Sequence, residues 1–194
     1  MSNPVRLLVG LGNPGTRYAG TRHNAGAAFV RALADARGGN LQRDSRFFGE
    51  TGLIAIGAIS LRLLIPNTYM NLSGKSVTAM AGYYRLCAAE MLVAHDELDI
   101  EPGQCRFKAG GGHGGHNGLR NIVESLGSSD FYRLRIGIGH PGKAGDVSEY
   151  VLSRAPAEER TRTQAAIAEA LRILPDAIGG NWAIAMNRLH SFSA

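Results

Sequence analysis

Four short, mainly apolar runs in this chain of 194 residues are each followed by a cluster of polar side chains. The runs are residues 5–10, 61–65, 91–94 and 105–108. Such runs are typical of buried strands. If the four strands belong to one sheet, the clusters meet at one edge, where ligands bind in open α/β sheets. We therefore expect one binding site that is assembled from distant parts of the chain.

The clusters supply amides, imidazoles, aromatic rings and carboxylates. Their members are Asn13, Tyr18 and His23, then Tyr69, Met70 and Asn71, then His95, Asp96 and Glu97, and finally His113, His116 and Asn117. Each asparagine could be a turn residue on its own. Three at one edge favour recognition of a neutral amide such as a peptide backbone, because each side chain offers both a donor and an acceptor.

Strand and helix patterns alternate along the whole chain, which predicts a single α/β domain over residues 1–194. We expect a twisted mixed sheet with helices on both faces. The predicted strands are 5–10, 47–56, 59–65, 91–95, 104–108 and 132–138. The predicted helices are 24–37 with Asn24 as N-cap, 73–84 with Ser73 as a candidate cap, 119–126, a long helix from Pro156 past Leu174, and a last helix through Trp182 and Leu189.

The composition indicates the cellular compartment of the protein more clearly than it indicates the reaction or the ligand. The net charge of +5 suits a polyanionic partner, but it also suits an enzyme that is merely basic. Cys87 and Cys105 form no C-x-x-C pair, so we expect buried thiols in a reducing compartment. Residues 1–4 show no export signal, and no apolar run approaches the ~20 residues of a membrane span. We expect a cytoplasmic protein that does not enter membranes.

A glycine motif at residues 10–15 raises a competing interpretation. It matches G-x-G-x-x-G after a strand, the pattern of dinucleotide-binding folds. In those folds the third glycine opens a helix, whereas here the helix is predicted to start near Asn24. The acidic residue at the right spacing, Asp35, falls inside that helix instead of ending a second strand. A nucleotide-dependent oxidoreductase is therefore the alternative, not the main hypothesis.

His23 and Asp96 are the candidate catalytic pair. His23 precedes a helix and Asp96 leaves a strand, and adjacent central strands would bring them together. An aspartate bonded to one imidazole nitrogen fixes the tautomer and stabilises the imidazolium that forms when the other nitrogen takes a proton from water. The chain has no G-x-S-x-G nucleophile motif, and the histidine spacing does not match a zinc site. We expect water as nucleophile, and neither cofactor nor metal.

Five long blocks of the chain resemble bacterial peptidyl-tRNA hydrolase. They are Val9–Asn24 (VGLGNPGTRYAGTRHN), Ile65–Lys75 (IPNTYMNLSGK), Val93–Gly103 (VAHDELDIEPG), Lys108–Leu119 (KAGGGHGGHNGL) and Phe131–Gly142 (FYRLRIGIGHPG). That family hydrolyses the ester between a peptide and the terminal ribose of tRNA. The resemblance implies a cytoplasmic monomer that needs no metal and takes peptidyl-tRNA as its substrate.

The resemblance also implies a role for each matching residue. It makes His23 the general base and Asp96 the acid that supports it. It implies substrate contacts by Asn13, Tyr18, Tyr69, Met70, Asn71, Gly114 and Asn117. Lys108 and Arg135 match positions associated with tRNA phosphates, and both follow alternating patterns that place them opposite apolar neighbours. A non-catalytic RNA-binding protein that kept the fold is the second alternative.

Overall fold

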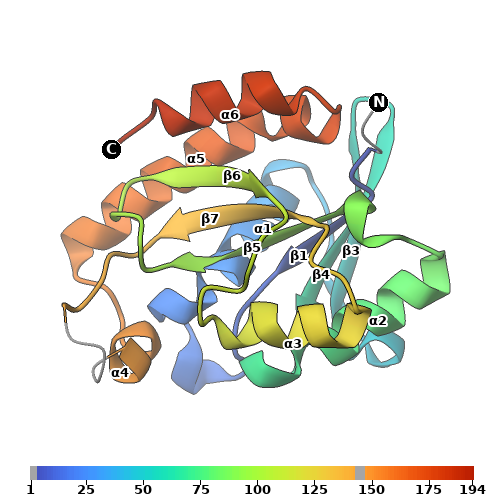
Figure 1. The fold of residues 1–194 in the computed structure, drawn as a ribbon, viewed down its shortest axis with the longest axis horizontal. Helices are drawn as coiled ribbons and strands as arrows, with labels where there is room; N and C mark the ends of the chain where they lie inside the picture. The colour runs from blue at the N-terminus through green and yellow to red at the C-terminus, as the bar shows by residue number, and fades with distance from the viewer. Residues whose placement is uncertain (1–3, 143–146) are drawn as a thin grey trace.

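One mixed β-sheet forms the centre of the computed structural model, which describes residues 4–142 and 147–194. The described residues form seven strands: β1 (Leu7–Gly10), β2 (Gln42–Asp44), β3 (Gly49–Ile56), β4 (Ile59–Pro66), β5 (Met91–Glu97), β6 (Cys105–Ala109) and β7 (Tyr132–Gly137). Their order across the sheet is β2-β3-β4-β1-β5-β7-β6 (Figure 1). The central strands β4, β1, β5 and β7 are parallel, whereas β3 and β6 run antiparallel to their neighbours.

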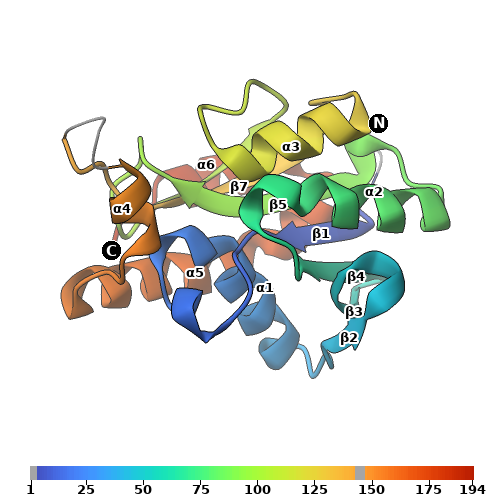
Figure 2. The ribbon, with the colours of Figure 1, turned by 90° about the horizontal axis from the view of Figure 1, so that it is seen from below.

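Helices cover both faces of this sheet. They are α1 (Ala25–Ala36), α2 (Ser73–Tyr84), α3 (Asn117–Leu126), α4 (Val147–Leu152), α5 (Ala157–Ile178) and α6 (Trp182–His190). Figure 2 shows α2 and α3 on one side of the sheet and α1 and α5 on the other. The predicted α/β fold, a mixed sheet with helices on both faces, is confirmed.

The central strands are apolar along their whole length because both of their faces are buried. Leu8 and Leu92 are paired in register on β1 and β5, and they belong to the core that α1, α5 and α6 cover. Leu7 and Val93 point to the opposite face and join the core under α2 and α3. Alternate residues of one strand thus serve two cores.

Several predicted boundaries need correction. Asn24 makes no capping bond to α1, because its side chain is bonded to the backbone N–H and C=O of Asn13. Ser73 is the first residue of α2 rather than its cap, and its hydroxyl donates to the carbonyl of Met70. Helix α3 begins at residue 117, two residues earlier than predicted.

Other differences concern segments without a clear pattern. Strand β2 (Gln-Arg-Asp) carries no apolar residue, and α4 has only six residues, so neither was predicted. Strand β5 extends through Glu97, so the polar cluster at residues 95–97 belongs to the strand and does not follow it. Cys105 is buried as predicted, but Cys87 is exposed because it lies in the loop that leads into β5.

The glycine-rich segment takes an unexpected route. Ala109 at the end of β6 pairs with Tyr132 at the start of β7. The end of β6 therefore lies at one edge of the sheet, and the carboxyl ends of β1, β4 and β5 lie at the other edge. The prediction that all four clusters follow strand ends at one edge is therefore wrong for this cluster. Residues 110–116 run back across the sheet to the start of α3 (Figure 1). Gly110, Gly111 and Gly114 all have positive φ on this path, a conformation that favours glycine.

No helix among the described residues combines the length and the apolar character that are needed to cross a lipid bilayer.

Candidate active site

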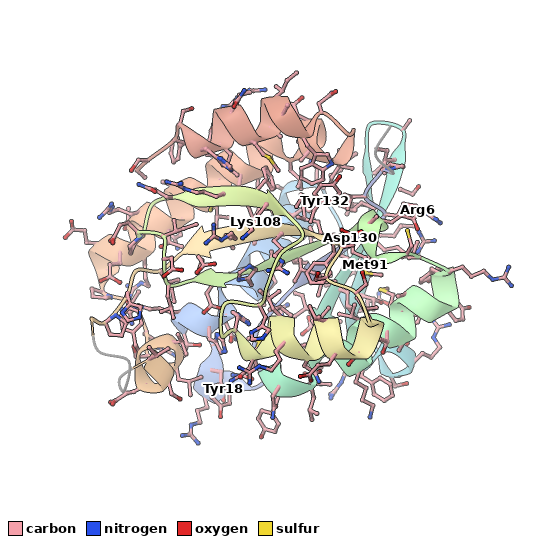
Figure 3. The ribbon with its side chains drawn as sticks, viewed as in Figure 1. Arg6, Tyr18, Met91, Lys108, Asp130 and Tyr132 are labelled. Carbon is pink, nitrogen blue, oxygen red and sulfur yellow. The ribbon has the colours of Figure 1, made fainter. Side chains whose placement is uncertain are left out.

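An open cavity of about 840 Å³ lies where β1, β4 and β5 end. Its volume is in the range of small-ligand sites. The predicted site residues that line it are Asn13, His23, Tyr69, Met70, Asn71, Asp96, Gly114 and Asn117. Tyr18, Lys108 and Arg135 do not line it. Tyr18 lies in a short 3-10 turn, and Lys108 lies on β6 (Figure 3).

The predicted contact between His23 and Asp96 is present. The Nδ1 atom of His23 lies 3.0 Å from both carboxylate oxygens of Asp96. A carboxylate only accepts hydrogen bonds when ionised, so Nδ1 carries the proton and Nε2 is left as the basic nitrogen. Both residues are buried, at 9% and 4% exposure. His23 belongs to a 3-10 turn directly before α1, and this turn packs against β5.

His116 is a second imidazole on the same carboxylate, and no role was predicted for it from the sequence. Its Nε2 lies 3.0 Å from Oδ1 of Asp96. Its Nδ1 accepts hydrogen bonds from the backbone N–H groups of Gly118 and Leu119, so it caps α3. Since Nδ1 accepts, Nε2 must carry the proton and donate to Asp96. The sequence carried no signal for this role, because the helix pattern begins only at Leu119, three residues after His116.

Asp96 stays ionised in this arrangement. Burial on its own would raise its pKa, but the charges and hydrogen bonds of His116 and His23 hold that pKa well below the usual range. The neighbouring His95 behaves differently. Burial, followed by the proximity of His116, lowers the pKa of His95 to about 3, so its ring is neutral at physiological pH.

His23, Asp96 and His116 also form the one group of described residues whose ligand atoms are close enough to hold a metal ion, all within 4.8 Å of one another. Both Asp96 oxygens and both His116 nitrogens already make hydrogen bonds. A metal would have to replace N–H donors that now satisfy a buried carboxylate. The donor set therefore fits the hydrogen-bonded arrangement better than a metal centre.

Three hydrogen bonds hold Asn13 in one orientation. Its Oδ1 accepts from the backbone N–H of Met70 at 2.7 Å, and its own backbone is bonded on both sides by Asn24. Because the oxygen is occupied, Asn13 offers only its N–H₂ donors to the cavity. Asn71 and Asn117 are exposed, and their side chains make no hydrogen bond within the described residues.

The cations of β6 and β7 share one face of the sheet. Lys108 is paired in register with Arg133, and Arg106 with Arg135. In Figure 1 the visible side of these two strands carries no helix. The Nε of Arg135 donates to Glu97 at 2.8 Å, whereas Lys108 makes no ion pair within the described residues. Arg133 is buried, which the alternating pattern did not predict.

Helix α4 completes one wall of the cavity with Val147, Ser148, Val151 and Leu152. The buried side chain of Arg22, the residue before His23, attaches α4 to the rest of the site. Arg22 donates to the Ser153 hydroxyl at 2.7 Å and to Glu159 at 2.9 Å, and its guanidinium stacks 4.0 Å from the ring centre of Tyr150. The sequence carried no pattern that linked these segments.

Comparison with known proteins places this geometry in a family. The family model described as peptidyl-tRNA hydrolase matches residues 7–194. A peptidyl-tRNA hydrolase of Pseudomonas fluorescens is 54% identical over 191 residues, which cover 98% of each chain. One of Shewanella woodyi is 55% identical over 195 residues, which cover 100% of each chain.

Solved structures agree with this assignment. The crystal structure of peptidyl-tRNA hydrolase from Acinetobacter baumannii matches with a TM-score of 0.95 and 49% identity, covering 100% of this chain and 97% of that one. The similarity thus extends over sequence and fold together. The chain belongs to the peptidyl-tRNA hydrolase family.

Proposed function

We propose that this protein hydrolyses the ester bond between a peptide, or an N-blocked aminoacyl group, and the 3′-terminal ribose of tRNA. The observation that carries the proposal is the His23–Asp96 pair, with its one uncommitted imidazole nitrogen in a cavity lined by amide donors. His23 Nε2 takes a proton from water as that water attacks the ester carbonyl. Asp96 stabilises the imidazolium that forms. A positioned base of this kind contributes about 10²–10⁴-fold to the rate.

Asn13 selects substrates whose α-nitrogen is blocked. Its N–H₂ group donates to the acyl carbonyl next to that nitrogen, because its oxygen is held by Met70. An unblocked substrate has no such carbonyl and carries an ammonium group, which a donor repels. Asn71 is the candidate donor to the developing oxyanion, since its amide is uncommitted and lines the same cavity. Tyr69, Met70, Gly114 and Asn117 complete the substrate contacts. Tyr18, which lies outside the cavity, contacts substrate only beyond it.

The tRNA is bound through its phosphates by Lys108 and Arg135. Both lie on the open face of β6 and β7, and neither belongs to the cavity. Phosphate contacts carry no sequence information, which suits an enzyme that accepts every tRNA. We further propose that the protein acts as a cytoplasmic monomer without metal or cofactor.

The two alternatives have less support. Gly15 is followed by a 3-10 turn, and α1 begins only at residue 25, so no helix N-terminus faces a dinucleotide. A non-catalytic RNA-binding protein would have no need of two imidazoles on one buried carboxylate. A nicotinamide-cofactor titration and a hydrolysis assay separate these functions from the proposed one.

The direct test is incubation with N-acetyl-aminoacyl-tRNA and with its unblocked counterpart, each with and without a chelator. We expect rapid hydrolysis of the blocked substrate only, unchanged by the chelator. The His23→Ala variant should lose about 10²–10⁴-fold in kcat while still binding tRNA. Near-normal turnover of that variant would show that His23 is not the base.

A further inference from the structure

The glycine segment, residues 110–116, connects the end of β6 to the start of α3 and thereby positions the site residues His116 and Asn117. It begins at the far end of β6 and must end with His116 against Asp96 and with Asn117 in the cavity. Its backbone has access to many conformations because most of its residues are glycine. Within the segment, one backbone bond closes a turn, from the N–H of His116 to the carbonyl of His113 at 2.9 Å. Something outside the segment has to hold it in place.

The N–H of Gly110 donates to the Phe131 carbonyl at 3.0 Å, and the side chain of Arg133, on β7, holds the residues that follow Gly110. Its Nη1 donates to the carbonyl of Gly112 and its Nη2 to the carbonyl of Gly111. The side chain is buried at 3% exposure, and its Nε makes no hydrogen bond within the described residues. Two neighbouring carbonyls held by one planar fork restrict both position and rotation of the segment, which a single point charge cannot do.

Arg133 therefore differs from the other cations on its face. Lys108 lies beside it in register and Arg135 lies two residues along the same strand, yet only Arg133 is buried among them. Its forked donors point to backbone carbonyls instead of to solvent, so they are not available to a phosphate. No carboxylate of the described residues pairs with it.

We propose that Arg133 is a positioning residue, which holds the glycine segment so that His116 and Asn117 reach their places at the active site. The consequence for the reaction rests on the proposed function. Loss of the fork lets residues 110–116 move, so His116 leaves Asp96 part of the time and Asn117 no longer meets the substrate in a fixed orientation. Displacements of about 1 Å near reacting groups cost up to about 100-fold in rate.

The test compares Arg133→Lys with Arg135→Gln. Arg133→Lys keeps the charge and removes the fork. We expect its kcat to fall about 10- to 100-fold, while the KM for peptidyl-tRNA and the salt dependence of tRNA binding stay unchanged. Arg135→Gln should instead show a higher KM and a shallower salt dependence of binding. A kcat of Arg133→Lys within two-fold of the unmodified protein, or a loss confined to KM, would overturn the proposal.

A second readout needs no activity at all. Amide hydrogen exchange at residues 115–118 should accelerate in Arg133→Lys, and the imidazole nitrogen resonances of His116 should shift, while the amides of β5 stay protected. Unchanged exchange and resonances would refute the positioning role even if the protein proved to have another activity. Conversely, a wild-type protein inactive on peptidyl-tRNA would refute only the proposed function.

Chemical rescue separates positioning from general stability. In Arg133→Ala, added methylguanidinium should refill the fork site and restore part of the lost kcat, and it should do nothing for His23→Ala. Absence of rescue in an Arg133→Ala variant that is folded by circular dichroism would count against the fork as the active element. If Arg133→Ala does not fold, the Arg133→Lys comparison decides the matter.

Discussion

Gly26 in the first turn of α1 lies so close to Ala94 in β5 that a Cβ at position 26 would come within 2.1 Å of the Ala94 carbonyl oxygen. No other residue fits there without moving the helix. This contact sets the distance between the turn that carries His23 and the strand that carries Asp96. The close approach of two backbones, rather than any side chain, therefore brings the candidate base to its acid.

Substitution of Gly26 tests this contact. Gly26→Ala should push α1 away from β5 and lower kcat by at least about ten-fold, together with a loss of stability of about 1–3 kcal/mol from overpacking. Enzyme assay and urea unfolding measure the two effects. Gly82→Ala is the matched control, because Gly82 is an exposed helical glycine with open space around it. That variant should be as stable as the parent or more so. Equal behaviour of the two variants would contradict the role of the contact.

Asp96→Asn tests the shared carboxylate. Asparagine offers one oxygen and a donor group where two imidazole N–H groups now donate, so one ring must change its tautomer or lose its partner. We expect kcat to fall by about 10²–10⁴-fold with tRNA binding retained. Steady-state kinetics with a blocked aminoacyl-tRNA give both numbers. Asp99→Asn, an exposed acid on the following turn, should leave kcat as it is.

The buried ring of His95 predicts how stability depends on pH. Its pKa is about 3 in the folded protein and 6.5 in the unfolded chain, so between these values only the unfolded chain binds the proton. The stability that neutral His95 contributes is complete above pH 6.5 and is lost as the pH falls toward 3, by up to about 1.4 kcal/mol per pH unit. Urea unfolding between pH 7 and pH 4 should show a steeper loss for the parent than for His95→Asn. Parallel curves would contradict the burial of a neutral imidazole.

Asn13→Asp should weaken the preference for blocked substrates. A carboxylate can still accept from the N–H of Met70, but it has no donor for the acyl carbonyl and attracts an ammonium group. The ratio of kcat/KM for blocked over unblocked aminoacyl-tRNA should therefore fall by at least about ten-fold, the factor that about 1.4 kcal/mol supplies. Asn13→Ala removes the donor without adding charge, so it should lower the rate on blocked substrate and gain nothing on the unblocked one. An unchanged ratio for Asn13→Asp would show that selection lies elsewhere.

Removal of a phosphate contact has a specific salt signature. Lys108→Ala should weaken tRNA binding and reduce the slope of log affinity against log salt concentration by about one. Filter binding or fluorescence anisotropy at several salt concentrations measures this slope. Lys75→Ala is the charge-matched control, because the Lys75 ammonium stacks 4.0 Å from the ring centre of Phe48, away from β6 and β7. The same slope change in both variants would mean that only net charge matters.

The sequence predicted the parts of this site that follow local rules. The apolar runs of β1 and β5 are visible because both strand faces are buried, and the contact of His23 with Asp96 follows from two adjacent parallel strands. The route of residues 110–116 was missed, because whether β6 runs parallel or antiparallel depends on pairing across the sheet and not on its own pattern.

The burial of Arg133 was missed for a related reason. Its strand pattern is the same as that of Arg135, and only the segment that passes over it distinguishes the two. The cap by His116 was likewise invisible, since the helix pattern begins with Leu119 while the cap depends on the imidazole tautomer. The local pattern of a strand predicts which face of the sheet a side chain is on. Whether that side chain is buried depends on a segment from a different part of the chain.

Strand β1 lies between β4 and β5, although it precedes both in the chain. A ribosome-bound intermediate that ends before β5 therefore has His23 without its carboxylate, and one that ends before residue 116 lacks the second imidazole. No contiguous fragment that lacks any part of residues 23–116 contains both imidazoles and the carboxylate between them. Hydrolytic turnover would consequently serve as a readout of complete synthesis and correct strand insertion, and a polypeptide cut between β4 and β5 should regain it only when both pieces reassociate.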